Sequence, residues 1–204
     1  MDGLNPSFSL AVPERWYVRD ADTREWESST ASQMDERLAC RPDLLAAAST
    51  LRRVVMDSWK DAESQGALAA ATLWEPSDDG RGATAATLVV VAAERARPDD
   101  GAAEIAGLVA ALGEPSESDL APRRVSAVEL PVGPAVRLRR LTRTTGAGPG
   151  EGELVVDTVQ HWVPVPGGRT IVVLAGSTPC LDVADELAEA FDAIAATLRF
   201  DTHR

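Results

Sequence analysis

Two short runs in the sequence are apolar at every position, and they constrain the fold more than any other feature. Residues 88–91 read Leu-Val-Val-Val, and residues 171–174 read Ile-Val-Val-Leu. Successive side chains of a strand point to opposite faces of a sheet, so an unbroken apolar strand has to be covered on both faces. The two runs therefore predict central strands of a sheet that other elements cover on both sides.

Further strands are predicted by alternating polarity and by turn residues between the apolar segments. The opening strand, residues 8–13, ends at Pro13, and we expect its hairpin partner to begin at Trp16. The other strands are predicted over residues 68–74, 85–92, 124–130, 135–142, 154–163 and 171–175. The segment 163–168, Val-Pro-Val-Pro-Gly-Gly, predicts a tight reversal, because its glycines accept the positive φ that turns require. Connections this short make neighbouring strands antiparallel.

Three segments have the spacing of amphipathic helices, namely residues 43–65, 101–112 and 182–199. Helices at these positions supply the cover that the apolar strands need. The predicted fold class is therefore α+β: an antiparallel sheet flanked by helices on both faces, an α/β/α sandwich. The length of 204 residues favours one domain spanning residues 1–204.

Charge and composition exclude several classes of partner. The formal net charge is -12, from 32 acidic and 20 basic residues, and such a surface repels phosphate backbones, so we expect no nucleic-acid partner. No stretch approaches the roughly 18 apolar residues of a membrane span, so no membrane insertion is expected. Residues 1–20 lack the pattern of a signal peptide, which predicts a cytoplasmic protein.

The residues that could carry catalysis do not form a convincing set. Asp157 and His161 share one face of a predicted strand, but four residues of strand separate them by roughly 13 Å. The turn at 163–168 would place Ser177 beside residue 156, away from His161. We therefore interpret His161 as a structural residue and predict no catalytic site and no enzyme.

Metal and cofactor sites are likewise not expected. The second histidine, His203, lies near the end of the sequence, and Cys40 and Cys180 match no metal or redox motif. Two reduced thiols are favoured over a disulfide, which stays an alternative. The glycine-rich residues 145–152 carry no Lys-Ser/Thr pair, and so indicate a hairpin loop rather than a phosphate loop.

Positive charge is concentrated in one part of the sequence. The arginines concerned are Arg123, Arg124, Arg137, Arg139, Arg140 and Arg143. They either form a solvated edge and pair with nearby acids, or form a patch that binds an acidic partner. Trp26 lies in a polar stretch without apolar periodicity, so it is a candidate for an exposed anchor. The predicted partner-binding residues are Trp26, Arg137, Arg139 and Arg143.

The pattern Phe8-x-Leu10-x-Val12-Pro13-x-x-Trp16 resembles the opening strand of the Mog1/PsbP-like fold superfamily, which includes PsbP, DcrB and LpqN-like proteins. The predicted order of elements, ending in Phe191-x-x-Ile194-x-x-Thr197-Leu198, is also similar to that fold over nearly the whole chain. The resemblance implies a non-catalytic interaction module without cofactor. The DcrB and LpqN-like members carry a lipoprotein leader, and this sequence departs from them there.

Two functional hypotheses follow. The first is a protein-interaction module of adaptor or chaperone type that serves a secretion or envelope system. The second is a small-ligand binding domain that uses a cleft between sheet and helix. The expected partner is another protein of unknown identity, and a second copy of the chain, forming a homodimer, is an open alternative.

Overall fold

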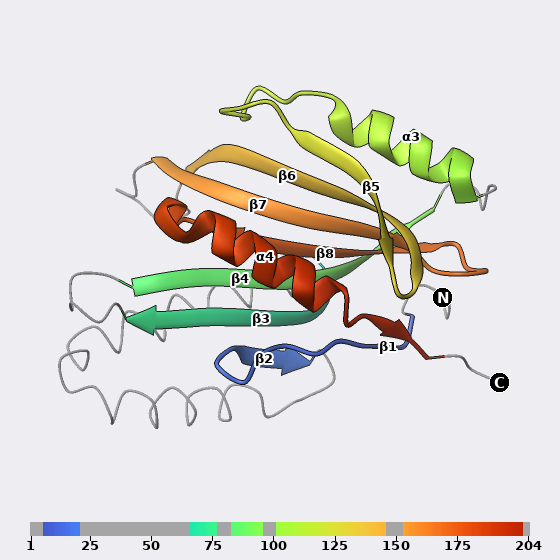
Figure 1. Cartoon of the computed structure of the whole chain (residues 1–204), viewed down its shortest axis with the longest axis horizontal. Coiled ribbons are helices and arrows are strands. Elements are labelled where there is room, and N and C mark those ends of the chain that lie inside the picture. The colour runs from blue at the N-terminus through green and yellow to red at the C-terminus, as the bar shows by residue number, and fades with distance from the viewer. Residues whose placement is uncertain (1–5, 21–65, 77–82, 96–100, 146–152, 202–204) are drawn as a thin grey trace.

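A seven-stranded antiparallel sheet forms the centre of the protein (Figure 1). The structure is a computed structural model, and it describes residues 6–20, 66–76, 83–95, 101–145 and 153–201. The strand order is β2-β3-β4-β8-β7-β6-β5. The strands are β2 (Tyr17–Asp20), β3 (Ala67–Pro76), β4 (Ala83–Glu94), β5 (Arg124–Leu130), β6 (Gly133–Thr145), β7 (Glu153–Pro164) and β8 (Thr170–Thr178).

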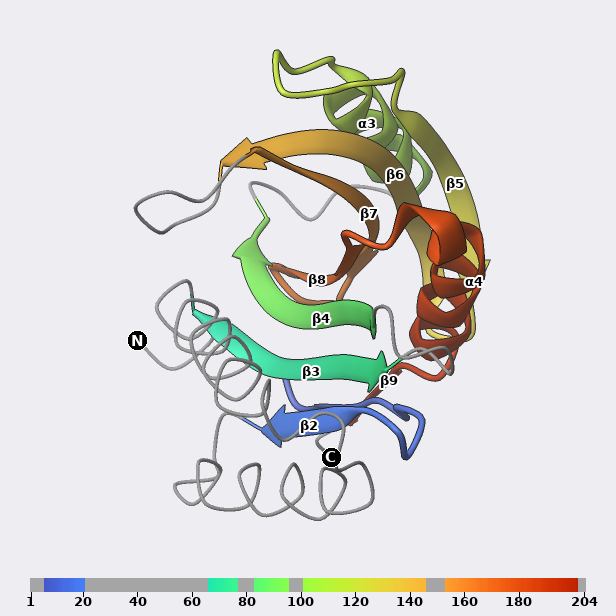
Figure 2. The ribbon, with the colours of Figure 1, turned by 90° about the vertical axis from the view of Figure 1, so that its left-hand side faces the viewer.

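The two unbroken apolar runs lie in β4 and β8, which are neighbours in the middle of the sheet. All four residues of the run in β8 are buried, which confirms the predicted burial on both faces for this strand. In β4 the run is less evenly covered, because Leu88 and Val90 are buried whereas Val89 and Val91 are half-buried. The sheet is strongly curved from β2 to β5 (Figure 2).

Two helices of the described residues pack against this sheet. Helix α3 (Gly101–Gly113) contacts β5 and β6, and helix α4 (Ala184–Ala195) contacts β7 and β8 (Figures 1 and 2). A 3-10 turn, η2 (Leu181–Val183), leads into α4. The predicted α+β class is confirmed. The helix predicted over residues 43–65 lies outside the described residues, so the two-sided sandwich and the single domain stay predictions.

The main core lies between α4 and one face of the sheet. The helix contributes Leu187, Phe191 and Ile194, and the strands contribute apolar residues of β4, β7 and β8. Gly176 of β8 lies directly against the ring of Phe191: a Cβ at this position would stand 2.3 Å from the ring atom Cδ1. Trp16 meets the same ring edge-on, with 5.9 Å between the ring centroids. Phe191 therefore occupies a notch that only glycine leaves open.

The first and last described segments form a separate two-stranded sheet, which corrects two predictions. Strand β1 (Phe8–Ser9) pairs with β9 (Arg199–Phe200), whereas the segment after Trp16 forms β2 and pairs with β3. The last helix ends at Ala195 and not at residue 199. The physical reason is that the Thr197 hydroxyl donates to the carbonyl of Ile194 and accepts from the backbone N–H of Ala11 at 2.9 Å, which directs the chain away from the helix axis toward β1.

The chain reverses direction between β7 and β8, at the position that the sequence predicts. Gly167 has a φ of 68°, a value that glycine adopts without steric cost. The backbone N–H of Val165 donates to the carbonyl of Thr170 at 2.9 Å and closes the turn. The resulting register sets Ser177 opposite Thr158, so Ser177 lies away from His161, as the sequence predicts.

Candidate functional site

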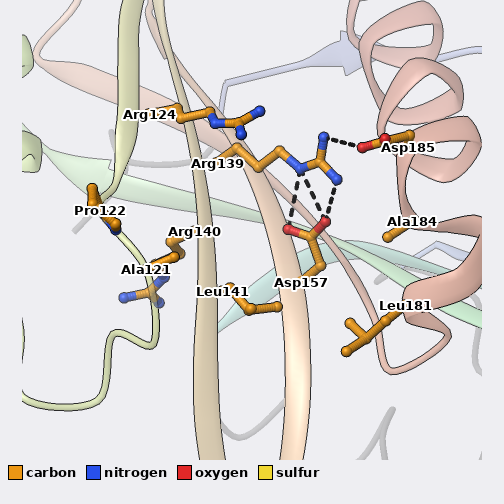
Figure 3. A pocket seen from close by; sticks show the side chains of 10 residues that line it. All are labelled: Ala121, Pro122, Arg124, Arg139, Arg140, Leu141, Asp157, Leu181, Ala184 and Asp185. Atoms are coloured by element: carbon orange, nitrogen blue, oxygen red, sulfur yellow. Dashed lines mark hydrogen bonds and ion pairs between the residues drawn. The ribbon is translucent and has the colours of Figure 1, made fainter.

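A charged cleft of about 330 Å³ lies between strands β6 and β7 and the start of α4 (Figure 3). The strands and the segment before β5 form one wall, while η2 and the first turn of α4 form the other. The lining residues are Ala121, Pro122, Arg124, Arg139, Arg140, Leu141, Asp157, Leu181, Ala184 and Asp185. The cleft therefore joins three arginines and two aspartates to a partly apolar rim.

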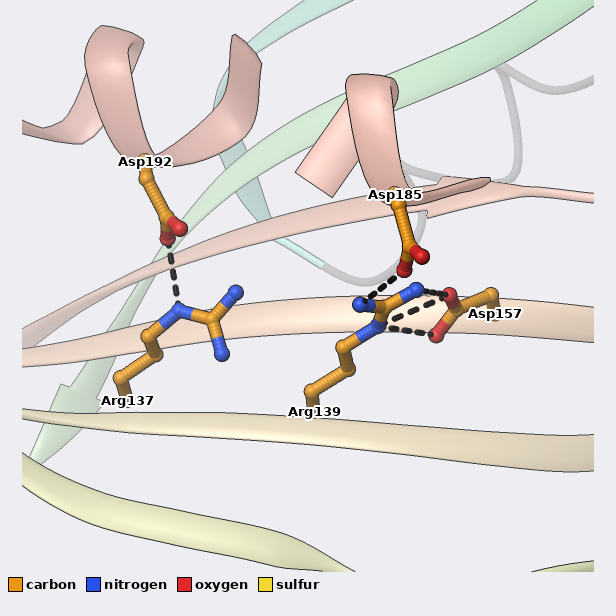
Figure 4. Close-up of polar contacts among 5 residues, drawn as sticks. All are labelled: Arg137, Arg139, Asp157, Asp185 and Asp192. Atoms are coloured by element: carbon orange, nitrogen blue, oxygen red, sulfur yellow. Dashed lines mark hydrogen bonds and ion pairs between the residues drawn. The ribbon is translucent and has the colours of Figure 1, made fainter. Parts of the chain in front are cut away.

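Arg139 is held by two carboxylates that come from different elements (Figures 3 and 4). Its Nε and Nη2 donate to Asp157 Oδ2 at 2.9 and 2.5 Å, and its Nη1 lies 2.6 Å from Asp185 Oδ1. Asp157 stands on the adjacent strand, where the register sets it opposite Leu141, diagonal to Arg139 on the same face. The hydrogen bond to Asp157 raises the pKa of Arg139 above its ordinary value.

The two ion pairs of Arg139 differ in their exposure to solvent. The side chains of Arg139 and Asp157 are 18% and 7% exposed, whereas that of Asp185 is 86% exposed. Exposed ion pairs are weak because water and salt screen them, whereas a buried charge without its partner is costly. Asp157 is therefore the structural partner of Arg139, and Asp185 is a weakly held one.

Arg124 is a further charged residue that lines the cleft. It lies directly opposite Arg139 on the neighbouring strand β5 and is exposed. Like charges opposite each other across two strands repel. Within the described residues, Arg139 has its charge offset by Asp157 and Asp185, whereas the side chain of Arg124 makes no hydrogen bond or ion pair. Arg124 thus leaves an uncompensated positive charge beside the cleft.

A second polar cluster fastens α4 to the sheet. Asp192 Oδ1 accepts from Nε of Arg137 at 2.7 Å and lies 2.9 Å from Nε2 of the buried His161. Figure 4 shows the contact between Arg137 and Asp192 beside the Arg139 cluster. Burial lowers the pKa of His161 below its usual value, although the carboxylate of Asp192 acts in the opposite direction. The role of this cluster is to hold the helix in place.

This cluster predicts that stability falls when the pH drops below about 6.5, the ordinary pKa of histidine. The folded-state pKa of His161 lies below the unfolded-state value, so its stabilising contribution is present above about pH 6.5 and is lost as the pH falls toward the folded-state pKa. Urea unfolding of the wild type at pH 7.5, 6.5 and 5.5 should show this loss of unfolding free energy. In the variant His161→Gln the unfolding free energy should fall less over the same pH range.

The matched control is His203→Gln, since the chain contains two histidines. This variant should keep the pH dependence of the wild type. Equal slopes of unfolding free energy against pH for wild type and His161→Gln would contradict the assignment.

The predicted partner-binding residues are placed as follows. Arg137 and Arg139 share one face of β6, as expected, but this face is turned toward α4 and both side chains are ion-paired within the chain. Arg143 is exposed near the end of β6, and its backbone N–H donates to the carbonyl of Ser118 at 3.1 Å. Trp26 lies outside the described residues. A partner-binding role for these four residues stays a prediction.

The structure also shows what the sequence reasoning missed. Asp192 and Asp185 come from the last helix, and the sequence analysis assigned no partner to either of them. Asp157 was considered as a partner of His161, but it pairs with Arg139. The sequence did contain one signal for this site, namely the cluster of arginines between residues 123 and 143, which includes Arg124.

Cys180 and the possible metal ligands of the described residues were considered next as candidates for a catalytic or metal site. The Sγ of Cys180 accepts a hydrogen bond from the backbone N–H of Ala85 at 3.3 Å, and Cys40 lies outside the described residues. Within the described ranges, no group of three or more His, Cys, Asp or Glu side chains is arranged to hold a metal ion. No helix of these ranges has the length and apolar character to span a membrane.

A second cavity, of about 260 Å³, lies beneath the opening segment. It is bounded by the segment around β1 and by strands β2, β3 and β4. The lining residues, nine of them apolar, are Phe8, Ser9, Leu10, Val12, Val18, Ala69, Ala70, Ala71, Leu88 and Val90. This apolar cavity is distinct from the charged cleft.

Comparison with known proteins gives a relation at the level of the fold. No protein-family model matches the sequence, and no curated protein matches it. Among solved structures, the chain is similar to LpqN, described as involved in cell envelope biogenesis of Mycobacterium tuberculosis, with a TM-score of 0.51 and 14% sequence identity. The match covers 98% of this chain and 87% of LpqN. Because LpqN has the Mog1/PsbP-like fold, this similarity supports the resemblance seen in the sequence, for the fold alone.

Proposed function

We propose that this protein is a non-catalytic interaction module of adaptor or chaperone type, acting in the cytoplasm for an envelope or secretion system. The observation that carries the proposal is the charged cleft, with the exposed and uncompensated Arg124 at its mouth in a protein of net charge -12. A local positive charge on an acidic protein favours a partner of opposite charge at that place. The envelope or secretion context is supported by the fold shared with LpqN.

The composition of the cleft favours binding over catalysis. Its ten lining residues include no histidine, cysteine, serine, threonine or tyrosine, so the described wall offers no nucleophile with an adjacent base. The histidine that the described residues contain, His161, is buried and contacts Asp192 in the neighbouring cluster. The charges of the cleft are therefore better suited to recognition than to bond making.

The proposal is tested by site-specific photocrosslinking in the native cells. A photoreactive phenylalanine analogue at Leu181, an exposed rim residue, should capture a protein, because the rim would touch the bound partner. The control position is the exposed Arg169 in the turn between β7 and β8. Absence of any adduct at position 181 beyond those at position 169 would contradict the proposal.

The apolar cavity favours a second candidate function, the binding of a small apolar molecule. A concave space lined mainly by apolar side chains is the usual form of a small-ligand site. The neutral dye N-phenyl-1-naphthylamine should gain fluorescence with the wild type and lose that gain with Ala69→Phe, which fills the cavity. Equal fluorescence with both proteins would exclude this site.

A further inference from the structure

We infer that the charged cleft binds the carboxylate of an acidic residue in a short partner segment that also carries apolar side chains, with Arg124 as the principal cation. The inference rests on the proposed function, because it names the chemistry of the partner at the same cleft. Four features support it: the unused hydrogen-bond donors of the Arg124 side chain, the charge balance of the cleft, the exposed and therefore weak ion pair between Asp185 and Arg139, and the apolar rim.

Arg124 supplies hydrogen-bond donors that the described residues leave unused. An arginine side chain has five N–H donors in a planar fork, which matches the two oxygens of a carboxylate. Arg124 projects from β5 on the same side as Arg139, as Figure 3 shows. An anion between these two guanidinium groups would remove their mutual repulsion, which water alone weakens only in part.

The charge balance favours a carboxylate over a phosphate. Three cations, Arg124, Arg139 and Arg140, line the cleft with two anions, Asp157 and Asp185, so the charges of the lining sum to +1. One added carboxylate would bring this charge to zero, whereas a phosphate monoester would leave roughly -0.5 to -1. The excess of acidic residues over the whole chain opposes polyanions still more strongly. A single carboxylate is therefore the anion that this cleft tolerates best.

Asp185 occupies the place that an incoming carboxylate would take. It contacts Nη1 of Arg139 at 2.6 Å while remaining almost fully exposed, and it stands in the first turn of α4. The positive end of the helix dipole favours a carboxylate at this position, whichever molecule supplies it. Because the pair is exposed, Asp185 can turn into solvent while Asp157 keeps Arg139 in place.

The rim of the cleft predicts apolar residues beside the acidic one. Leu181 is a large apolar side chain that is 47% exposed, and Ala121 and Pro122 are exposed on the opposite side. Apolar contacts around a central polar group are the usual arrangement of a binding surface. The segment that fits is thus an acidic residue flanked by apolar ones.

The direct test uses full-length protein and a defined peptide. The probe is acetyl-Ala-Leu-Glu-Leu-Ala-amide, and binding is followed by NMR titration at low salt. Its glutamine counterpart should bind at least about tenfold more weakly, since a hydrogen bond to a charged group is lost. Equal binding of the two peptides, or no binding of either, would overturn the inference. Sodium acetate binding as tightly as the peptide would assign the cleft to a free small carboxylate and overturn the peptide segment.

Two pairs of variants place the binding in the cleft. Arg124→Glu should weaken the glutamate peptide about tenfold or more, whereas Arg169→Glu, with the same charge change on an exposed turn, should leave it within about twofold. Asp185→Asn should tighten binding several-fold by freeing Nη1 of Arg139, whereas Glu189→Gln, an exposed acid further along α4, should not. Equal effects within either pair would show a general charge effect and overturn the site.

The two proposals fail in distinguishable ways. If crosslinking at Leu181 captures a protein and Arg124→Glu does not reduce that capture, the carboxylate inference fails while the interaction module stands. If crosslinking captures nothing, the proposed function itself fails. Melting temperatures of all variants, expected within a few degrees of the wild type for these exposed positions, show that each protein is folded.

Discussion

Replacing Phe191 with alanine is expected to lower the free energy of unfolding by about 3–5 kcal/mol, the largest effect of any single change considered. The side chain is 2% exposed, and its ring lies against Gly176 on one side and Trp16 on another. Its removal leaves a cavity that the rigid strand β8 cannot close. Total stabilities of single domains are about 5–15 kcal/mol, so urea unfolding should show a midpoint far below that of the wild type.

Gly176→Ala tests the same contact from the opposite side. The added Cβ would stand 2.3 Å from the ring of Phe191, so α4 has to move, at a cost of about 1–3 kcal/mol or more. In the Phe191→Ala background the ring is absent, and the same change should cost much less. The control is Gly168→Ala, whose Cβ would meet Val165 at an ordinary 3.5 Å and should be tolerated. If the losses of unfolding free energy from Gly176→Ala and Phe191→Ala were additive, the close contact between position 176 and the ring of Phe191 would be contradicted.

Arg139→Met is expected to be the second most damaging change, at about 3 kcal/mol. It leaves the carboxylate of Asp157, which is 7% exposed, without the cation that now holds it by three hydrogen bonds. Breaking a buried pair costs about 3–5 kcal/mol, and the partial exposure of Arg139 favours the lower end of this range. Chemical denaturation at neutral pH measures the loss.

The double variant Arg139→Met/Asp157→Leu separates the value of the ion pair from the cost of an orphaned charge. It should recover most of the lost stability, because an apolar pair of similar volume replaces two buried charges. Arg124→Met, at the exposed position directly across the strand, should change stability by no more than about 0.5 kcal/mol. A double variant as unstable as Arg139→Met would indicate that the pair itself stabilises the fold.

Most of the sheet could be predicted because its signals are local. The strand Arg124–Leu130 was predicted to the residue, and the run in β8 is buried on both faces as its composition requires. The helix Gly101–Gly113 differs by one residue from its prediction. The partner of the opening strand could not be predicted, because a period of two identifies a strand but not the strand with which it pairs.

The candidate site depends on contacts that local patterns do not contain. Arg139 and Asp157 meet because of the register between β6 and β7, and a glycine-rich segment such as 146–152 leaves that register open in the sequence. Asp185 and Asp192 reach the sheet only through the docking of α4. A concentration of arginines in the sequence thus indicated the right region but could not separate Arg137 and Arg139, which are paired within the chain, from Arg124.

The pairing of β1 with β9 bears on how the protein is made by the ribosome. Phe8 is opposite Phe200, and the backbone N–H of Asp201 donates to the carbonyl of Ser7 at 3.0 Å. At the usual rate of synthesis of 5–20 residues per second, roughly 10–40 s separate the appearance of these two segments. During that interval the opening segment has no strand to pair with, so this part of the fold forms only after β9 has been synthesised. Chaperones that shield emerging apolar segments therefore have a defined period in which to act.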